Sequence, residues 1–97
     1  MPASWCVYMV HCADGSLYTG IATDAARRVA EHNENDQLAA RYTRVRRPVE
    51  LVYLELCPDR AEAARREHAI KRLGRREKLA LIDAWRPRRK RAGSDGQ

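Results

Sequence analysis

The stretch that decides the fold runs from Trp5 to Ile21 and reads WCVYMVHC-ADGS-LYTGI. Its two ends are apolar and rich in residues that favour strands, and four turn-forming residues separate them. Two short β runs that flank an Asp-Gly pair are typical of a β-hairpin. We therefore expect antiparallel strands at about 5–12 and 17–21.

The length of the hairpin loop decides whether Tyr8 and Tyr18 lie on the same face. A two-residue loop of type I′ places them on opposite faces, because side chains alternate along a strand. A three-residue loop at 13–15, with Gly15 in the left-handed region as a bulge residue, pairs Tyr18 with Val10 and brings both phenols to one face. A joint role for the two tyrosines requires the three-residue loop.

The remaining sequence predicts three helices and one strand. The first helix should begin at a Thr23 cap and end near Asn33, before a polar, irregular stretch. A strand is expected at 49–57, and alternation divides its side chains into two faces, one with Val52, Leu54 and Leu56 and the other with Leu51, Tyr53 and Glu55. Later helices are expected from an Asp59 cap to about Leu73, where Gly74 marks the end, and from Arg75 to Trp85. The order ββαβαα predicts an α+β fold with a small, three-stranded, mostly antiparallel sheet flanked by helices.

Length and charge indicate one domain with a polyanionic partner. The 97 residues fit a single domain at 4–86, and a basic tail at 87–97 is expected to be disordered after Pro87 ends the last helix. Nineteen Lys and Arg against thirteen Asp and Glu give a net charge of +6, which favours nucleic acid over a membrane.

Cysteine usage and hydropathy indicate a cytoplasmic protein. The three cysteines form no C-x-x-C pair, so reduced, half-buried core thiols are favoured over a zinc site or a disulfide framework. Apolar runs stay well short of the roughly 18 residues that span a membrane. The first residues are too short and too polar for a signal peptide.

Several segments together resemble the GIY-YIG nuclease family. Tyr8 in Cys6-Val7-Tyr8, and Tyr18-Thr19-Gly20 ten residues later, resemble the signature itself. Arg28 follows Gly20 by eight residues, as the helical arginine of the family does, and His32 stands one turn later. Glu67 lies in a helix that resembles the metal-ligand helix. The resemblance covers residues 4–85, and the segments DGSLYTG, YTR and RPVELVY resemble the small stand-alone members in particular.

The resemblance implies a metal-dependent endonuclease that hydrolyses nucleic-acid phosphodiesters. DNA is the expected substrate, including branched or damaged forms met in DNA repair, with structure-selective or weakly selective cleavage. It implies catalytic roles for Tyr8, Tyr18, Arg28 and His32, with Tyr8 favoured as base and Tyr18 as orienter. A tyrosine with a pKa near its ordinary value of about 10 is a poor base, so a metal or an arginine must lower that pKa.

Glu67 is implied as the protein ligand of a single Mg²⁺ or Mn²⁺. One carboxylate is sufficient for such an ion, because Mg²⁺ keeps several waters. A guanidinium such as that of Arg28 suits the charge of the transition state.

Basic residues in the irregular stretch and at the junction of the last two helices are expected to contact phosphates, above all Arg44, Arg47, Lys71 and Arg72. Gly15 and Gly20 are expected at structural turns. Many relatives carry an asparagine after the metal-binding glutamate, whereas this chain has no Asn beyond Asn35. The alternative reading is therefore a nucleic-acid-binding module that keeps the nuclease fold with little or no catalysis.

Overall fold

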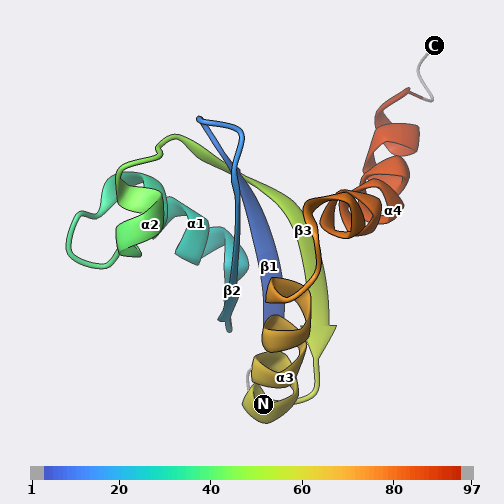
Figure 1. Ribbon diagram of the computed structural model, residues 1–97, viewed down its shortest axis with the longest axis horizontal. Coiled ribbons are helices and arrows are strands. Elements are labelled where there is room, and N and C mark those ends of the chain that lie inside the picture. The colour runs from blue at the N-terminus through green and yellow to red at the C-terminus, as the bar shows by residue number, and fades with distance from the viewer. Residues whose placement is uncertain (1–3, 95–97) are drawn as a thin grey trace.

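The computed structural model describes residues 4–94, with side chains to residue 85, and shows a three-stranded sheet with helices on both sides (Figure 1). Its elements are β1 (Trp5–Cys12), β2 (Leu17–Ala22), α1 (Ala25–Glu34), α2 (Arg41–Arg44), β3 (Val49–Cys57), α3 (Arg60–Lys71) and α4 (Arg75–Ser94). The strands are antiparallel in the order β2-β1-β3. The predicted fold class and order are confirmed, and the short helix α2 lies within the stretch that was expected to be irregular.

The β1–β2 hairpin has the three-residue loop. Tyr18 pairs with Val10, and Gly15 has a φ of +89°, in the left-handed region that glycine adopts without strain. The Gly15 N–H donates to the Cys12 carbonyl at 2.9 Å and closes the turn. Tyr8 and Tyr18 therefore lie on the same face of the sheet, as their joint role requires.

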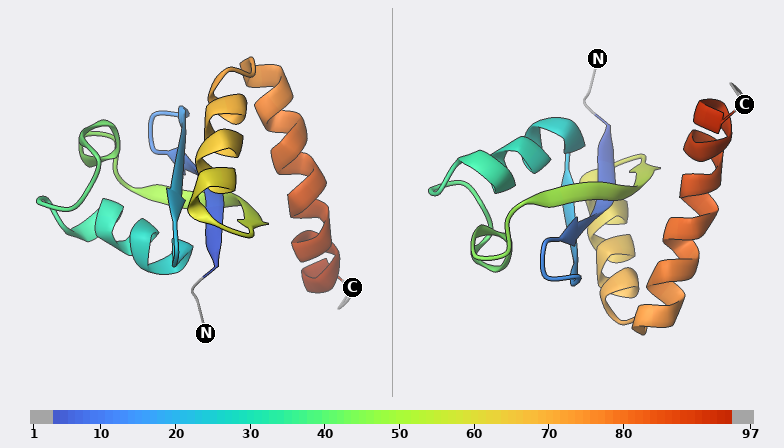
Figure 2. Two further views of the ribbon diagram at one scale, coloured as in Figure 1. Left: turned by 90° about the horizontal axis from the view of Figure 1, so that it is seen from below. Right: turned by 90° about the horizontal axis from the view of Figure 1, so that it is seen from above.

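The sheet separates two cores. On one face, Val7 and Met9 pack with Ala63 and Ile70 of α3 and Ile82 of α4. On the other face, the buried side chains are Cys6, Tyr8, Val10, Cys12, Ala22, Ala25 and Val49. Figure 2 shows α1 and α2 on one side of the strands and α3 and α4 on the other. Within residues 4–94, no helix combines the length and the apolar character that crossing a membrane requires.

A β-bulge in β3 overturns the predicted faces of that strand. Met9 pairs with Tyr53, whereas the next residue, Val10, pairs with Leu51, so that Val52 is an extra residue in the ladder. A bulge of this kind interrupts the alternation of side chains. As a result Val52 and Tyr53 both pack on the Met9 side, and Leu51 packs with Val10.

Two predicted helix ends are shifted. Asp24, and not Thr23, caps α1, because its Oδ1 accepts the Arg27 N–H at 3.0 Å. Gly74 does not end α3, whose C-cap is Arg72. Instead it precedes α4, and its N–H donates to Glu77 Oε1 at 2.9 Å. The predicted Asp59 cap is confirmed, with Oδ1 accepting the Glu62 N–H at 2.8 Å.

Helix α4 continues to Ser94, past Pro87, so the expected helix end near Trp85 is wrong. Proline removes one N–H donor and crowds the carbonyl four residues earlier, which perturbs the helix locally while the neighbouring turns keep their own hydrogen bonds. Residues 87–94 are thus helical and not irregular, and 95–97 lie outside the described residues. The division of the chain at residue 86 stays a prediction.

Candidate active site

Tyr8 projects from the middle of β1 and lies across Gly20 of β2. A Cβ atom at Gly20 would stand 2.5 Å from Tyr8 Oη, so the phenol fills the space that any other side chain would occupy. Gly20 lies inside a strand and not at a turn, which corrects the role predicted for it. Its lack of a side chain is what allows Tyr8, only 1% exposed, to reach the helix beyond.

The Tyr8 hydroxyl and the His32 ring of α1 form a buried hydrogen bond. Tyr8 Oη lies 2.8 Å from His32 Nε2, and the imidazole is fully buried. On its other side, Nδ1 lies 2.8 Å from the hydroxyl of Thr43 in α2. The main-chain carbonyl of His32 accepts a 2.6 Å hydrogen bond from Arg47 Nε. The ring is thus held from both sides and through its own backbone.

Burial determines the charge of this pair. It raises the pKa of Tyr8 well above the usual range, and the nearby Tyr18 acts in the same direction, while the Arg28 guanidinium offsets part of this rise. Burial, with Arg28 and Arg47 in support, lowers the pKa of His32 from 6.5 to about 4. Near neutral pH both rings are therefore uncharged, and a proton that moves from Tyr8 to His32 charges each ring while the net charge of the pair stays zero.

The buried, neutral His32 predicts a stability that falls in acid. Its folded-state pKa of about 4 lies below the unfolded value of 6.5, so the unfolded chain binds more protons between these values. The free energy of unfolding should therefore decrease as the pH falls from 6.5 toward 4, by up to about 3 kcal/mol. Urea unfolding at pH 7.5, 5.5 and 4.5 measures this.

The control for the acid effect is the exposed His11. His32→Gln should flatten the pH dependence in this window, whatever its overall stability, and His11→Gln should leave it unchanged. Equal slopes for wild type and His32→Gln would show that His32 charges as freely in the folded protein as in the unfolded chain.

Arg28 faces the pair from the same helix. Its Nη1 donates to Glu31 Oε1 at 3.0 Å and to the Leu38 carbonyl at 2.7 Å, and its charge influences the pKa of both Tyr8 and His32. The side chain is 27% exposed, against 65% for its neighbour Arg27. The prediction that Arg28 turns toward the sheet while Arg27 is solvated agrees with these positions.

Tyr18 lies at the centre of a stack of rings. It meets His32 edge-on at 5.4 Å between centroids and stacks on Tyr42 at 5.8 Å. The Arg46 guanidinium lies 3.8 Å from the centroid of Tyr42, and its Nε is 3.1 Å from Asp14 Oδ2. The sequence placed Arg46 among the basic residues expected to contact phosphates and Tyr42 in the YTR segment, but it did not reveal that the two side chains stack beside Tyr18.

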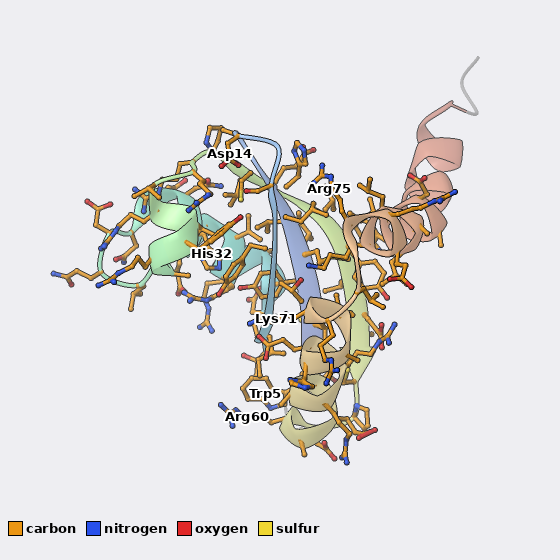
Figure 3. All side chains as sticks on the ribbon, in the orientation of Figure 1. Trp5, Asp14, His32, Arg60, Lys71 and Arg75 are labelled. Carbon is orange, nitrogen blue, oxygen red and sulfur yellow. The ribbon has the colours of Figure 1, made fainter. Side chains whose placement is uncertain are left out.

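Glu67 approaches from α3, which packs against β1 and β2. The negative charge of its carboxylate contributes to the raised pKa of Tyr8. The same carboxylate lies 3.3 Å from Lys71 Nζ. Lys71 Nζ in turn is 6.0 Å from the centre of the Tyr18 ring. Figure 3 shows His32 beside α1 and α2, and Lys71 where the end of α3 meets β2. Tyr8, Tyr18, Arg28 and His32 thus meet on the α1 side of the sheet, and Glu67 and Lys71 approach them from α3.

The carboxylate of Glu67 suits a hydrated ion. Among residues 4–94, no three His, Cys, Asp or Glu side chains gather as a metal-binding group, which does not fit structural zinc with its four protein ligands. Glu67 is 23% exposed. A single accessible carboxylate does fit Mg²⁺ or Mn²⁺ that keeps most of its waters and takes phosphate oxygens from a substrate.

The four predicted phosphate-binding residues differ in their surroundings. Arg47 turns inward, toward His32 and the Asp36 carboxylate, which its Nη1 contacts at 2.8 Å. Arg44 Nη1 donates to the main-chain carbonyl of Asp36 at 2.9 Å. Lys71 lies beside the site, and Arg72 is exposed at the end of α3. Phosphate contact by these four side chains stays a prediction.

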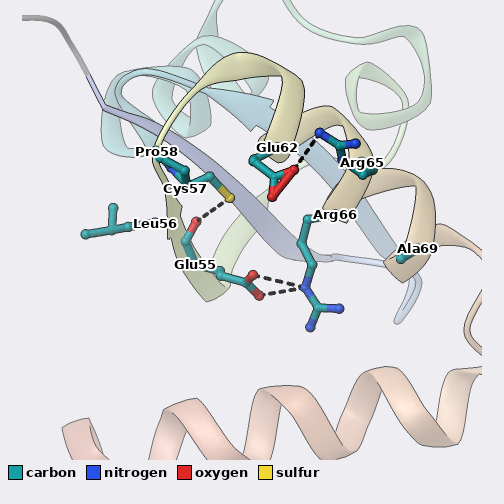
Figure 4. A pocket seen from close by; sticks show the side chains of 8 residues that line it. All are labelled: Glu55, Leu56, Cys57, Pro58, Glu62, Arg65, Arg66 and Ala69. Carbon is teal, nitrogen blue, oxygen red and sulfur yellow. Dashed lines mark hydrogen bonds and ion pairs between the residues drawn. The ribbon is translucent and has the colours of Figure 1, made fainter.

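A separate hollow of about 360 Å³ lies between the end of β3 and α3 (Figure 4). Its polar groups already bind one another: Arg66 Nε donates to both Glu55 oxygens at 2.9 and 3.0 Å, and Glu55 also accepts the Tyr53 hydroxyl at 2.6 Å. Tyr53 belongs to the core on the side of the sheet away from Tyr8. This hollow is therefore not part of the tyrosine site.

Comparison with known proteins identifies the class to which this arrangement belongs. The family model described as the GIY-YIG catalytic domain matches residues 4–80. The chain belongs to the GIY-YIG family, which supports a nuclease-type function and implies binding of nucleic acid.

Curated proteins that are similar to this chain carry the name UPF0213. The chain is 58% identical over 81 residues to a UPF0213 protein of Desulfotalea psychrophila, covering 84% of this chain and 73% of that protein. It is 53% identical over 76 residues to a UPF0213 protein of Staphylococcus aureus, covering 78% of this chain and 90% of that one. The solution NMR structure of a UPF0213 protein from Bacillus halodurans matches with a TM-score of 0.53 and 41% identity, covering 84% of both chains.

Proposed function

We propose that this protein is a metal-dependent endonuclease that hydrolyses DNA phosphodiesters, with structure-selective or weakly selective cleavage. The observation that carries the proposal is the buried contact of 2.8 Å between Tyr8 Oη and His32 Nε2. It pairs a hydroxyl with a potential proton acceptor, the arrangement by which a weak nucleophile or base is activated in enzymes.

The residues around this pair divide the chemistry among them. Tyr8 takes a proton from the attacking water as its own proton moves to His32, because the raised pKa of Tyr8 and the lowered pKa of His32 disfavour a phenolate that forms beforehand. Tyr18, packed against the His32 ring, orients the water or the phosphate, and Arg28 offsets the charge that develops on the phosphate. Glu67 would hold Mg²⁺ or Mn²⁺, and such an ion would supply charge neutralisation and assistance to the leaving oxygen.

Weak selectivity for DNA sequence follows if the protein contacts mainly the phosphates of its substrate. Lys71 presents a cation 6.0 Å from the Tyr18 ring, and Arg72 and Arg44 are exposed at the end of α3 and in α2. Contacts from such cations to phosphates position a nucleic acid without reading its sequence. Three buried cysteines without disulfide partners fit a reducing compartment, so we place this activity in the cytoplasm.

The test uses purified protein with branched, single-stranded and duplex DNA, each with Mg²⁺, with Mn²⁺ and with chelator. Wild type should cleave at least one substrate only when the metal is present. Arg28→Ala should cleave on the order of 10²-fold more slowly, because a guanidinium no longer faces the phosphate. Arg27→Ala, the exposed neighbour that shares Glu31 as a partner, is the matched control and should cleave as wild type does.

The same experiment distinguishes the alternative function. DNA binding that weakens with salt, without cleavage of any substrate in either metal, would overturn the enzyme and support a nucleic-acid-binding module. Cleavage of RNA counterparts in preference to DNA would correct the substrate while leaving the chemistry in place.

A further inference from the structure

A continuous chain of hydrogen bonds extends from Tyr8 beyond His32 into α2. His32 Nδ1 lies 2.8 Å from Thr43 Oγ1, and Thr43 Oγ1 donates to the main-chain carbonyl of Ala40 at 3.0 Å. Tyr8, His32 and Thr43 are exposed by 1%, 0% and 0% respectively. Because the chain is buried along its length, the protein itself determines where each proton lies.

The protons of this chain can be counted. Thr43 has a single hydroxyl proton, and the bond to the Ala40 carbonyl uses it. Its oxygen must then accept from His32 Nδ1–H, because a bare Nδ1 at 2.8 Å would set two lone pairs against each other. With the proton of the neutral ring on Nδ1, Nε2 is bare, and Tyr8 donates its hydroxyl proton to it.

The opposite tautomer fits the distances less well. In that tautomer Nδ1 is bare and accepts the Ala40 N–H at 3.3 Å. Thr43 must then give its proton to Nδ1 and lose its hydrogen bond to the Ala40 carbonyl, or keep that bond and turn an oxygen lone pair toward the lone pair of Nδ1. That carbonyl also accepts the Arg44 N–H at 2.9 Å. The arrangement with Nδ1 protonated uses all three of the contacts at 2.8–3.0 Å along the chain. It gives up only the longer contact of 3.3 Å from the Ala40 N–H to Nδ1.

We infer that Thr43 is a positioning residue that holds His32 in the tautomer with Nδ1 protonated, so that the bare Nε2 faces Tyr8. Its catalytic consequence rests on the proposed nuclease function. As the Tyr8 oxygen accepts the proton of the attacking water, the Tyr8 O–H bond breaks and a bond from that proton to Nε2 forms. The resulting imidazolium keeps its Nδ1–H on Thr43.

This role gives helix α2 a function in the site. In Figure 3 His32 lies between α2 and the strands, and the four residues of α2 bring the Thr43 hydroxyl to the far side of the ring from Tyr8. A base whose orientation is set by a third group is the general logic of catalytic triads. Here the third group is an uncharged hydroxyl, so it sets the tautomer without adding charge.

The test is ¹⁵N NMR of histidine-labelled protein, in which a protonated ring nitrogen is distinguished from a bare one. In wild type, His32 should be protonated at Nδ1 and bare at Nε2. Thr43→Val, which keeps the shape and removes the hydroxyl, should invert the tautomer, because the Ala40 N–H becomes the partner of Nδ1. Thr43→Ser should restore the wild-type pattern.

Activity provides a second readout on the same variants. Thr43→Val should lower kcat on the order of tenfold to a hundredfold with KM unchanged, and Thr43→Ser should recover most of the rate. Protonation of Nε2 in wild type, or an unchanged tautomer in Thr43→Val, would overturn the inference. If Thr43→Val does not fold, a wild-type ring protonated at Nε2 would still overturn the inference. An absence of cleavage in all proteins would overturn the nuclease proposal and leave the tautomer result standing.

Discussion

Tyr8→Phe should lower the cleavage rate on the order of 10³-fold while the protein stays folded. The substitution keeps the ring that packs on Gly20 and removes only the hydroxyl that contacts His32. Without that oxygen, no group accepts the proton of the water, and His32 has no proton to receive. The loss should appear in kcat, measured under single-turnover conditions, and DNA affinity should change little.

Tyr53→Phe is the matched control for this prediction. Tyr53 is also buried in the sheet and also hydrogen-bonded, to Glu55, but it lies in the opposite core. It should cleave at the wild-type rate. A Tyr8→Phe protein that cleaves within a factor of about three of wild type would remove Tyr8 from the chemistry, and unfolding of Tyr8→Phe would be detected by circular dichroism.

Glu67→Gln should abolish the response to metal. The amide keeps the size of the carboxylate but lacks the charge that attracts a hard cation. We expect cleavage to fall by on the order of 10³-fold and the concentration of Mn²⁺ needed for half-maximal rate to rise. Binding of DNA in chelator should persist or strengthen, because Lys71 loses the carboxylate that contacts it at 3.3 Å.

Glu62→Gln controls for general effects on α3. Glu62 lies on the same helix, where its carboxylate forms an ion pair with the exposed Arg65. Its removal should leave both the rate and the metal dependence intact. If Glu67→Gln required the same Mn²⁺ concentration as wild type, the metal would be held elsewhere and Glu67 would act only as a partner of Lys71.

The hairpin and its loop could be predicted because their causes are local. Gly15 is at the position where a three-residue loop needs a left-handed residue, and this choice of loop determines the faces of Tyr8 and Tyr18. The faces of β3 could not be predicted in the same way. The bulge at Val52 arises from pairing with β1, and nothing in the alternation of 49–57 indicates where an extra residue enters the ladder.

The surroundings of His32 also combine features that are visible in the sequence with features that depend on packing between elements. Its place one turn after Arg28 on an amphipathic helix is visible in the sequence, and so is its likeness to a family motif. Thr43 is eleven residues away, in a stretch whose sequence shows no periodic pattern, and only the packing of α2 on α1 places its hydroxyl 2.8 Å from Nδ1. The role of Gly20 was missed for a related reason, because a glycine within a strand does not reveal which ring will cross it.

The central claim is that Tyr8 and His32 act as one proton-transfer unit, and a double-mutant cycle tests it most directly. Single-turnover cleavage would be measured for wild type, Tyr8→Phe, His32→Gln and the double variant under identical metal and DNA conditions. The account predicts that the double variant is no slower than Tyr8→Phe alone, because His32 acts through the Tyr8 hydroxyl. Losses that multiply, or a His32→Gln protein as fast as wild type, would contradict it.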